Sequence, residues 1–240
     1  MEKPVVYLIP SILDESGIHT IPAYVAGCII NCRVFFVENE RSARRFVKQL
    51  CKTYLPGNEI TIDNYEWFTI HKAEEEAVAI FKQKLSEGNN IGIISEAGCP
   101  GVADPGQLLV AAAQEMNAEI KPLSGPSSIL LALMASGMNG QQFRFVGYLP
   151  IDHQKRIQTI KDLEAESRKK NCTQVFIETP YRNSQLLEVL LKSCSPATRL
   201  CIAADITGQN EWIKTKSIME WKKEKVDVHK RPAIFLILAH

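Results

Sequence analysis

The sequence has no run of about 18 or more apolar residues, which is roughly what a helix needs to cross a bilayer. Its start, Met-Glu-Lys-Pro-Val, lacks the long apolar stretch of a secretory signal peptide. The seven cysteines are scattered, and the pair Cys28 and Cys32 has no second pair or histidine at zinc spacing. We therefore expect a cytoplasmic protein with free thiols, no membrane contact and no metal site.

Charge of either sign is not in excess. The 28 basic and 27 acidic residues give a formal net charge of +1. This balance argues against a broad nucleic-acid surface, although it allows a local basic patch. The chain has 240 residues, of which 45% are hydrophobic, enough for one large domain or two small ones.

Short apolar runs alternate with amphipathic segments in the first half of the chain. Strands are predicted at 5–9, 33–37, 59–62 and 91–95, and helices at 21–30, 41–54, 71–85 and 108–116. Alternation of this kind indicates parallel βαβ units.

The second half has a different pattern. It contains predicted helices at 128–135 and 152–170, and predicted strands at 143–148, 175–178, 200–204, 212–215 and 233–238. This pattern indicates a mixed sheet with one or two helices. We place the boundary between an N-terminal α/β domain, residues 1–121, and a C-terminal α/β domain, residues 122–240.

The segment from Ser95 to Gly106 contains three glycines and two prolines directly after a predicted strand. A stiff loop at the carboxyl end of a parallel strand is where open α/β sheets bind ligands. It contains no Gly-Lys-Ser, no G-x-G-x-x-G and no Lys or Arg, so a cofactor without phosphates fits better than a nucleotide. Within it, Asp104 is expected to cap the next helix. The alternative is a simple strand-to-helix turn, although this segment is longer than such turns usually are.

A second loop, Pro122 to Ser128, combines two prolines, a glycine and three serines before an apolar helix. Hydroxyls and free amides at a helix N-terminus can bind a carboxylate or a polar head group. The alternative is an interdomain linker with an ordinary N-cap.

Together the segments IISEAGCPGVADPGQLLV, KPLSGPSSILLALMASGM and FRFVGYLP carry a resemblance. Their order and spacing are similar to the tetrapyrrole methylase superfamily, which uses S-adenosylmethionine. The closest resemblance is to the branch that methylates the 2′-hydroxyl of a cytidine in 16S ribosomal RNA. That branch has Ser-Asp-Ala-Gly-Thr-Pro in the first loop, from which Glu96 and Cys99 depart. It has Pro-Thr-Pro-Ile-Gly-Asn-Leu near its start, where this chain has Pro10 followed by Ser-Ile-Leu-Asp-Glu-Ser.

The resemblance implies two α/β domains, with a mostly parallel N-terminal sheet, a mixed C-terminal sheet and the cofactor in a cleft between them. It also implies a homodimer. The expected cofactor is S-adenosyl-L-methionine, with contacts from Pro10, Gly98, Cys99, Pro100, Val102, Asp104, Ser127, Ser128, Ile177, Ala203 and Ala233.

A 2′-hydroxyl is a poor nucleophile and benefits from a proton acceptor. Glu38 and Glu178, at the positions that match the branch's motifs, are the catalytic candidates, with Glu178 expected to be exposed. The alternative for both is an ordinary carboxylate at a strand end or helix cap. Arg41 and Arg182 are predicted to bind substrate, or else to be surface charges or partners for the neighbouring glutamates.

The predicted partner is ribosomal RNA or the small ribosomal subunit. RNA phosphates could contact basic residues that are otherwise a solvated helix face, namely Arg144, Lys155, Arg156 and the run 168–170. Two alternatives stay open. One keeps the fold and cofactor but acts on a tetrapyrrole or another small molecule, and the other is a non-catalytic protein that binds S-adenosylmethionine.

Overall fold

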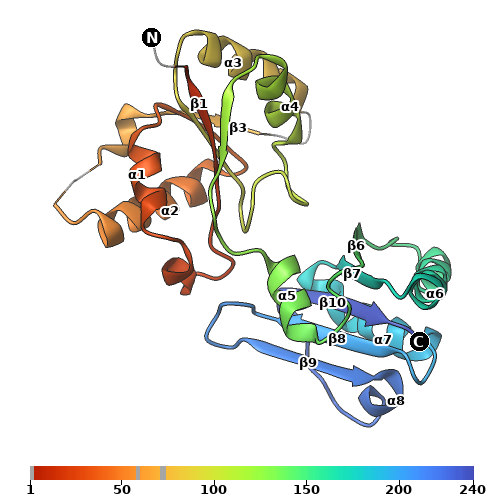
Figure 1. Ribbon diagram of the computed structural model, residues 1–240. Helices are drawn as coiled ribbons and strands as arrows, with labels where there is room; N and C mark the ends of the chain where they lie inside the picture. Colours follow the sequence, from red (N-terminus) through yellow and green to blue (C-terminus); the bar gives the residue numbers. More distant parts are fainter. Residues whose placement is uncertain (1–2, 58–59, 71–73) are drawn as a thin grey trace. The chain divides into compact units, whose positions relative to one another are not determined.

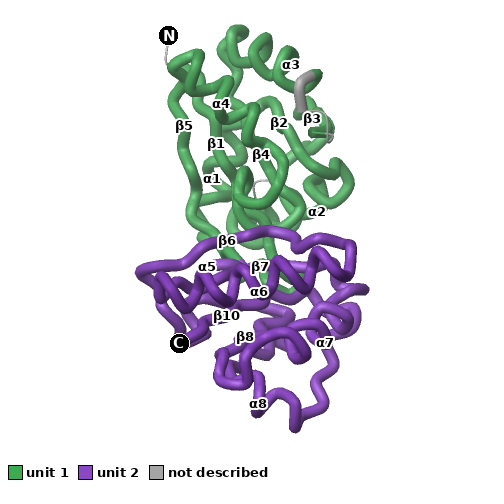
Figure 2. The backbone as a smooth tube through the Cα atoms, turned by 90° about the vertical axis from the view of Figure 1, so that its right-hand side faces the viewer, with its two compact units in different colours: residues 1–127 green, residues 128–240 purple. Residues whose placement is uncertain are grey.

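The computed structural model describes residues 3–57, 60–70 and 74–240. The chain divides into two compact units, residues 1–127 and 128–240 (Figure 2). Each is an α/β unit, the first with a parallel sheet and the second with a mixed sheet, which confirms the predicted fold class.

Unit 1 contains a five-stranded parallel sheet in the order β3-β2-β4-β1-β5. Its strands are β1 (Val5–Ile9), β2 (Val34–Val37), β3 (Glu66–Thr69), β4 (Ile91–Ile94) and β5 (Glu119–Pro122). Its helices are α1 (Tyr24–Ile30), α2 (Glu40–Tyr54), α3 (Glu74–Ser86) and α4 (Gln107–Glu115). In Figure 1, α1 and α2 cover one face of the sheet and α3 and α4 the other.

This covering explains why the central strands read as continuous apolar runs. All four residues of β2 and of β4 are buried. Phe35 of β2 packs in the core on the side of α1 and α2, whereas its neighbour Phe36 packs in the core on the side of α3 and α4. Alternate side chains of a strand thus serve two cores, as in parallel sheets generally.

The strand predicted at 59–62 was wrong, and one edge of the sheet is formed by a later segment. In the described part of 59–62 there is no strand, and residues 62–64 form a short 3-10 helix. The edge strand is instead β3, where Trp67 stacks on Phe35 with ring centroids 4.7 Å apart. Burial against a neighbouring aromatic ring stabilises this segment as a strand. The predicted start of α3 at 71 lies outside the described residues.

The division falls after Ser127, whereas the sequence predicted it after Lys121. Leu123 and Ser124 are hydrogen-bonded to other parts of unit 1. The amide of Leu123 donates to the carbonyl of Leu8 at 3.0 Å, and the amide of Ser124 donates to the hydroxyl of Tyr24 at 2.7 Å. The first bond continues the β1–β5 ladder, the second joins the loop to α1, and both explain why residues 123–127 belong with unit 1.

Unit 2 contains a five-stranded mixed sheet in the order β6-β7-β10-β8-β9. Only β6 and β7 are parallel to each other, and the remaining pairs are antiparallel. Its strands are β6 (Phe143–Tyr148), β7 (Thr173–Ile177), β8 (Arg199–Ala204), β9 (Trp212–Ser217) and β10 (Ala233–Leu238).

Four helices accompany this sheet, so the prediction of one or two was wrong. They are α5 (Ser128–Ser136), α6 (His153–Lys170), α7 (Asn183–Ser193) and α8 (Ile218–Trp221). The sequence analysis missed α7, although its buried residues Leu186, Leu187 and Leu190 have helical spacing. It also missed α8, a single turn closed by a capping box between Ser217 and Glu220.

Candidate functional site

Three loops of unit 1 meet at the carboxyl edge of its sheet. They follow β1, β2 and β4, which are neighbours in the order β2-β4-β1. The loops comprise residues 10–16, 38–39 and 95–106. The carboxyl edge of a parallel sheet is the usual ligand-binding edge in open α/β folds. Six of the predicted cofactor residues lie in these loops, namely Pro10, Gly98, Cys99, Pro100, Val102 and Asp104.

Backbone hydrogen bonds join the loop 10–16 to the glycine-rich loop 95–106. The amide of Ser11 donates to the carbonyl of Gly98 at 2.8 Å, and the amide of Gly98 donates back to the carbonyl of Ser11 at 3.2 Å. Gly98 has a φ of +75°, which favours glycine. The bridge fixes Pro10, which precedes Ser11, beside the glycine-rich loop.

The loop predicted at 122–128 lies against Pro10 and the glycine-rich loop. The Sγ atom of Cys99 donates to the carbonyl of Pro126 at 3.6 Å. A Cβ atom at Gly125 would lie 2.2 Å from Cβ of Pro10, so only glycine fits there. The structure therefore brings the loop 122–127 together with Pro10 and Cys99. Burial, helped by the charge of Asp104, raises the pKa of the Cys99 thiol, which keeps it protonated at neutral pH.

Asp104 is not the helix cap that the sequence predicted. Helix α4 begins at Gln107, and the N-cap is Gly106, which has a left-handed φ of +117°. Because the left-handed residue ends the loop, the cap position falls two residues after Asp104. Burial, together with the charges of Glu38 and Glu96, raises the pKa of the Asp104 carboxyl to about 6.

Glu38 joins the loop 38–39 to the glycine-rich loop 95–106. It directly follows β2, is partly buried, and accepts a hydrogen bond on Oε2 from the amide of Glu96 at 3.0 Å. Arg41 lies nearby in the exposed first turn of α2, whose N-cap is the side chain of Asn39. Glu38 and Arg41 therefore lie at the same sheet edge as the glycine-rich loop.

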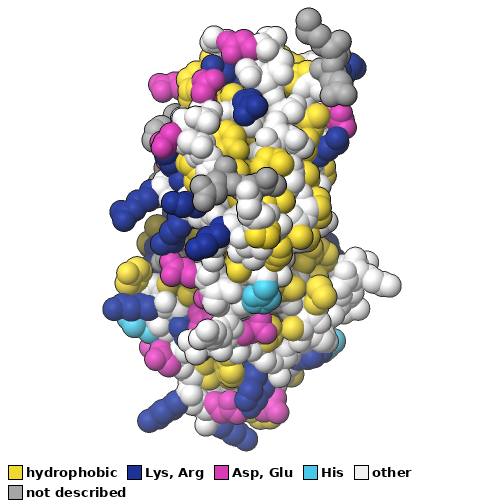
Figure 3. Space-filling view, turned by 90° about the vertical axis from the view of Figure 1, so that its left-hand side faces the viewer, with side chains coloured by type: hydrophobic (Ala, Val, Ile, Leu, Met, Phe, Trp, Pro, Cys, Tyr) yellow, Lys and Arg dark blue, Asp and Glu magenta, His cyan; other side chains and the backbone are white. Residues whose placement is uncertain are grey.

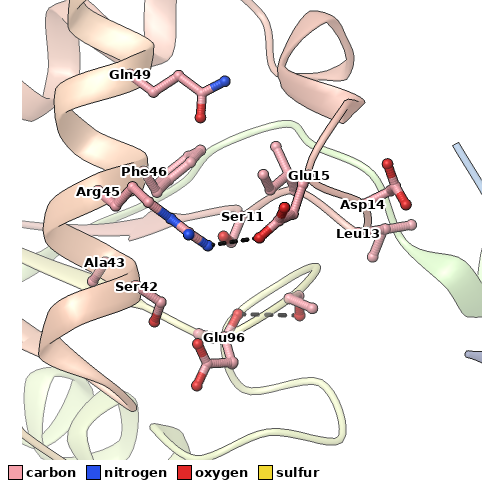
Figure 4. A pocket seen from close by; sticks show the side chains of 13 residues that line it. Ser11, Leu13, Asp14, Glu15, Ser42, Ala43, Arg45, Phe46, Gln49 and Glu96 are labelled. Atoms are coloured by element: carbon pink, nitrogen blue, oxygen red, sulfur yellow. Dashed lines mark hydrogen bonds and ion pairs between the residues drawn. The ribbon is translucent and has the colours of Figure 1, made fainter. Parts of the chain in front are cut away.

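A pocket of about 340 Å³ opens beside these loops (Figure 4). Its walls are residues 11–15, residues 95–97 and one face of α2, which contributes Ser42, Ala43, Arg45, Phe46 and Gln49. Arg45 crosses from α2 to the first loop, where its Nη2 lies 2.9 Å from Oε1 of Glu15. Sequence reasoning missed this pocket, because its walls come from three separate segments.

In unit 2, three predicted cofactor residues come together on adjacent strands. Ile177 of β7 and Ala203 of β8 both pair with Ile234 of β10, and Ala233 is the residue before it. Ala203 is fully buried. Ser127 ends unit 1, and Ser128 begins α5.

Glu178 is buried, contrary to the exposed carboxylate predicted from the sequence. The residue is 5% exposed, and its Oε1 accepts from Nη2 of Arg182 at 2.6 Å and from the amide of Thr179 at 2.7 Å. A one-turn helix, Pro180–Arg182, folds the arginine back over the strand end. The structure thus pairs Arg182 with its neighbouring glutamate.

Arg156 is a residue whose role the sequence did not reveal. It lies on the charged helix α6 but is only 3% exposed, so it is neither a solvated residue nor a phosphate contact. Its Nε and Nη2 donate to the carbonyls of Pro150 and Ile151 at 2.9 and 3.0 Å, and Nη2 lies 3.8 Å from Oε2 of Glu178. Arg156 and Glu178 thereby tie the loop after β6 to the end of β7.

Across 3–57, 60–70 and 74–240, no group of three or more His, Cys, Asp or Glu side chains is placed to hold a metal ion. Among the same residues, no helix combines the length and apolar character that a membrane span requires.

Comparison with known proteins agrees with this architecture. The family model of the Tetrapyrrole (Corrin/Porphyrin) Methylases matches residues 24–220. The methyltransferase CobJ has a TM-score of 0.64 at 16% identity, with 100% of this chain and 95% of CobJ covered. Cobalt precorrin-4 methyltransferase CbiF has a TM-score of 0.59 at 12% identity, with 98% and 94% covered. At these identities the two structures show the fold alone.

Curated relatives are more similar in sequence. Ribosomal RNA small subunit methyltransferase I of Escherichia coli O157:H7 is 30% identical over 181 residues, which are 74% of this chain and 62% of that protein. The protein of the same name from Synechocystis is 36% identical over 128 residues, 53% of this chain and 44% of that protein. The chain thus spans less than two thirds of these relatives.

The family match extends from α1 into the last helix, and so includes four of the five strands of each sheet and the glycine-rich loop. The fold, the three loops and this match agree with one another, and the chain belongs to the tetrapyrrole (corrin/porphyrin) methylase family.

Proposed function

We propose that this protein is an S-adenosylmethionine-dependent methyltransferase that methylates a cytidine 2′-hydroxyl in the RNA of the small ribosomal subunit. The observation that carries the proposal is the 30% identity, over 74% of this chain, to a protein named ribosomal RNA small subunit methyltransferase I. Membership of a methylase family supports the reaction class.

The glycine-rich loop fits this cofactor. Residues 95–106 include no Lys or Arg, and a Cβ atom at Gly101 would meet nothing within 4 Å, so space is open beside the backbone. Backbone groups and a neutral thiol suit a ligand that is polar at both ends and has a net charge near zero. Residues of this loop, with Pro10 and Ser127, would hold S-adenosylmethionine, which supplies a methyl group on a positively charged sulfur.

The protein's own task is to align the acceptor, exclude water and receive a proton. We propose that Glu38 accepts this proton, because its side chain is partly buried and held by a hydrogen bond from the amide of Glu96. Glu178 suits this task less well, because its carboxylate is enclosed between Arg156 and Arg182. We propose instead that Glu178 orients Arg182, which binds substrate together with Arg41.

An RNA substrate also requires a positively charged surface. Helix α2 carries Arg41, Arg45, Lys48 and Lys52, all exposed and spaced three or four residues apart, so they form one stripe along the helix. Figure 3 shows Lys and Arg side chains gathered on one flank of the face that it presents. A local stripe reconciles RNA binding with the net charge of +1. A ribosomal substrate also implies the cytoplasm, and we include a homodimer in the proposal.

The test compares 16S RNA from cells with and without this protein by mass spectrometry. Loss of one 2′-O-methylcytidine, restored by the wild-type gene, is the expected result. An unchanged methylation pattern would remove the RNA function. Calorimetry with S-adenosylmethionine then separates the alternatives: binding without RNA methylation leaves a small-molecule methylase or a non-catalytic binder, and absence of binding rejects both.

A further inference from the structure

The pocket beside α2 has walls of mixed chemistry. Phe46 at 4% exposure provides a buried apolar surface, and Ser11 and Ser42 add hydroxyl groups. The lining contains three carboxylates, those of Asp14, Glu15 and Glu96, and one guanidinium, that of Arg45, which pairs with Glu15. The formal charge of the lining is therefore negative, which disfavours a phosphate and favours a ligand that donates hydrogen bonds.

One of these carboxylates is fixed in place. Oδ1 of Asp14 accepts from the amide of Ser16 at 2.8 Å and from its hydroxyl at 2.5 Å. These bonds lower the pKa of Asp14, so it stays ionised at neutral pH. The carboxylate of Glu15 is different, because it is paired with Arg45 in a largely exposed ion pair. A pair of this kind contributes little stability and separates readily when a ligand arrives.

Opposite charges lie side by side here. The acidic pocket adjoins the basic stripe of α2, defined above by Arg41, Arg45, Lys48 and Lys52, and Arg45 belongs to both. A single-stranded nucleic acid has this same division, since its phosphates are negative while its bases are neutral and carry hydrogen-bond donors. The volume of about 340 Å³ is ample for one base and its ribose.

We propose that this pocket receives an amino-bearing pyrimidine of the RNA substrate, while the neighbouring phosphates lie along the basic stripe of α2. Cytosine presents an exocyclic amino group, for which Glu and Asp carboxylates are the usual acceptors. Uracil presents a carbonyl oxygen at the same position, which a carboxylate repels. The pocket thus selects cytosine over uracil through Glu96 and Asp14.

This inference rests on the proposed function and deepens it. Glu96 lines the pocket with its side chain, while its amide donates to Glu38, the assigned proton acceptor. A base held against Glu96 therefore brings its own ribose toward Glu38. The segment 11–15, where the sequence departs from the family pattern, supplies the opposite wall.

The experiment measures binding of cytidine and of uridine to the full chain by ligand-observed NMR. Ser42→Leu fills the pocket from α2, and Thr53→Leu is the matched control on the same helix, outside the pocket. Both hydroxyls donate to a backbone carbonyl within one turn, so each substitution removes a similar bond. We expect Ser42→Leu to weaken cytidine binding about tenfold or more, and Thr53→Leu to leave it unchanged. Glu96→Gln should reduce the preference for cytidine over uridine by about tenfold.

Three outcomes would each overturn the inference. They are equal cytidine binding by the two leucine variants, equal binding of cytidine and uridine by the wild type, and no binding of either nucleoside by the wild type. Titration of each variant with S-adenosylmethionine and the RNA methylation assay are read separately. Methylation that is intact in Ser42→Leu rejects the pocket and keeps the function. If Ser42→Leu abolishes cytidine binding but the wild-type protein does not methylate RNA, the pocket assignment stands and the proposed function is rejected.

Discussion

Gly125 contacts Pro10 so closely that a Cβ atom at residue 125 would lie 2.2 Å from Cβ and 2.4 Å from Cγ of the proline ring. Neither partner can give way easily. Pro10 is buried and directly precedes the residue that bridges to Gly98, and Leu123 and Ser124 on the other side are bonded to unit 1. The contact therefore holds the loop 122–127 at a fixed separation from the loop 10–16, which is in turn bridged to the glycine-rich loop.

Gly125→Ala should destabilise the protein by about 1–3 kcal/mol, because overpacking forces the backbone apart. It should also weaken binding of S-adenosylmethionine, since Pro10 moves. Gly140→Ala is the matched control, because a Cβ there meets nothing within 4 Å. Urea unfolding and calorimetry measure the two effects. Equal stability of the two alanine variants would show that the loops can separate at no cost.

Gly98→Val should abolish detectable binding of S-adenosylmethionine. A β-branched side chain at a φ of +75° is strained, and its Cβ would lie 3.5 Å from Cδ2 of Leu13. Gly57→Val carries similar backbone strain at a φ of +89°, away from the loops and with nothing within 4 Å. Both variants should lose stability, by about 1–3 kcal/mol. Only the first should lose cofactor affinity, and retained affinity in Gly98→Val would mean that the cofactor binds elsewhere.

Glu178→Gln should lower the free energy of unfolding by about 3–5 kcal/mol, because it leaves the buried Arg156 without its counter-charge. Glu188→Gln is the control, since Glu188 and Lys192 form an i,i+4 pair like that of Glu178 and Arg182 but are 70% and 78% exposed. That control should leave stability almost unchanged. If both substitutions lower the free energy of unfolding by the same small amount in urea, the buried ion pairs do not hold the end of β7.

Asp104 should make stability fall as pH rises through the acidic range. Its pKa is raised to about 6 in the folded protein from a usual value of 3.8, so the folded state holds the proton more tightly than the unfolded state. The contribution is therefore fully present below pH 3.8 and is lost as pH rises through about 6. Asp104→Asn should gain stability relative to the wild type between pH 4.5 and pH 7, in urea unfolding at the two pH values. The exposed substitution Asp162→Asn should show no such change, and a constant difference for Asp104→Asn would contradict the assignment.

The sequence predicted those parts of the fold that depend on local pattern. β1, β2 and β4 are short apolar runs buried on both faces, and the glycine-rich loop follows directly from its composition. β3 was missed because Trp67 is stabilised by stacking on Phe35, which lies far from it in the chain. The signal for α7 was present in its leucines and was overlooked.

Contacts between distant segments explain the other differences. Nothing in the charged sequence of α6 distinguishes Arg156 from the exposed Lys155, because its burial depends on carbonyls at 150 and 151 and on Glu178. Asp104 had the residue type and position of a helix cap, yet the left-handed Gly106 took that place. The pocket beside α2 required three segments to meet, which no single pattern reports.

The bridge between Ser11 and Gly98 uses only main-chain atoms, and this has an evolutionary consequence. Substitution of Ser11 or of the residues after it leaves both hydrogen bonds intact, since every residue type except proline offers the same amide and carbonyl. The first loop can therefore change its side chains freely while remaining attached to the glycine-rich loop. Such an attachment would let a methylase acquire a new acceptor by mutation in one loop, without rebuilding the neighbouring loop that we propose holds its methyl donor.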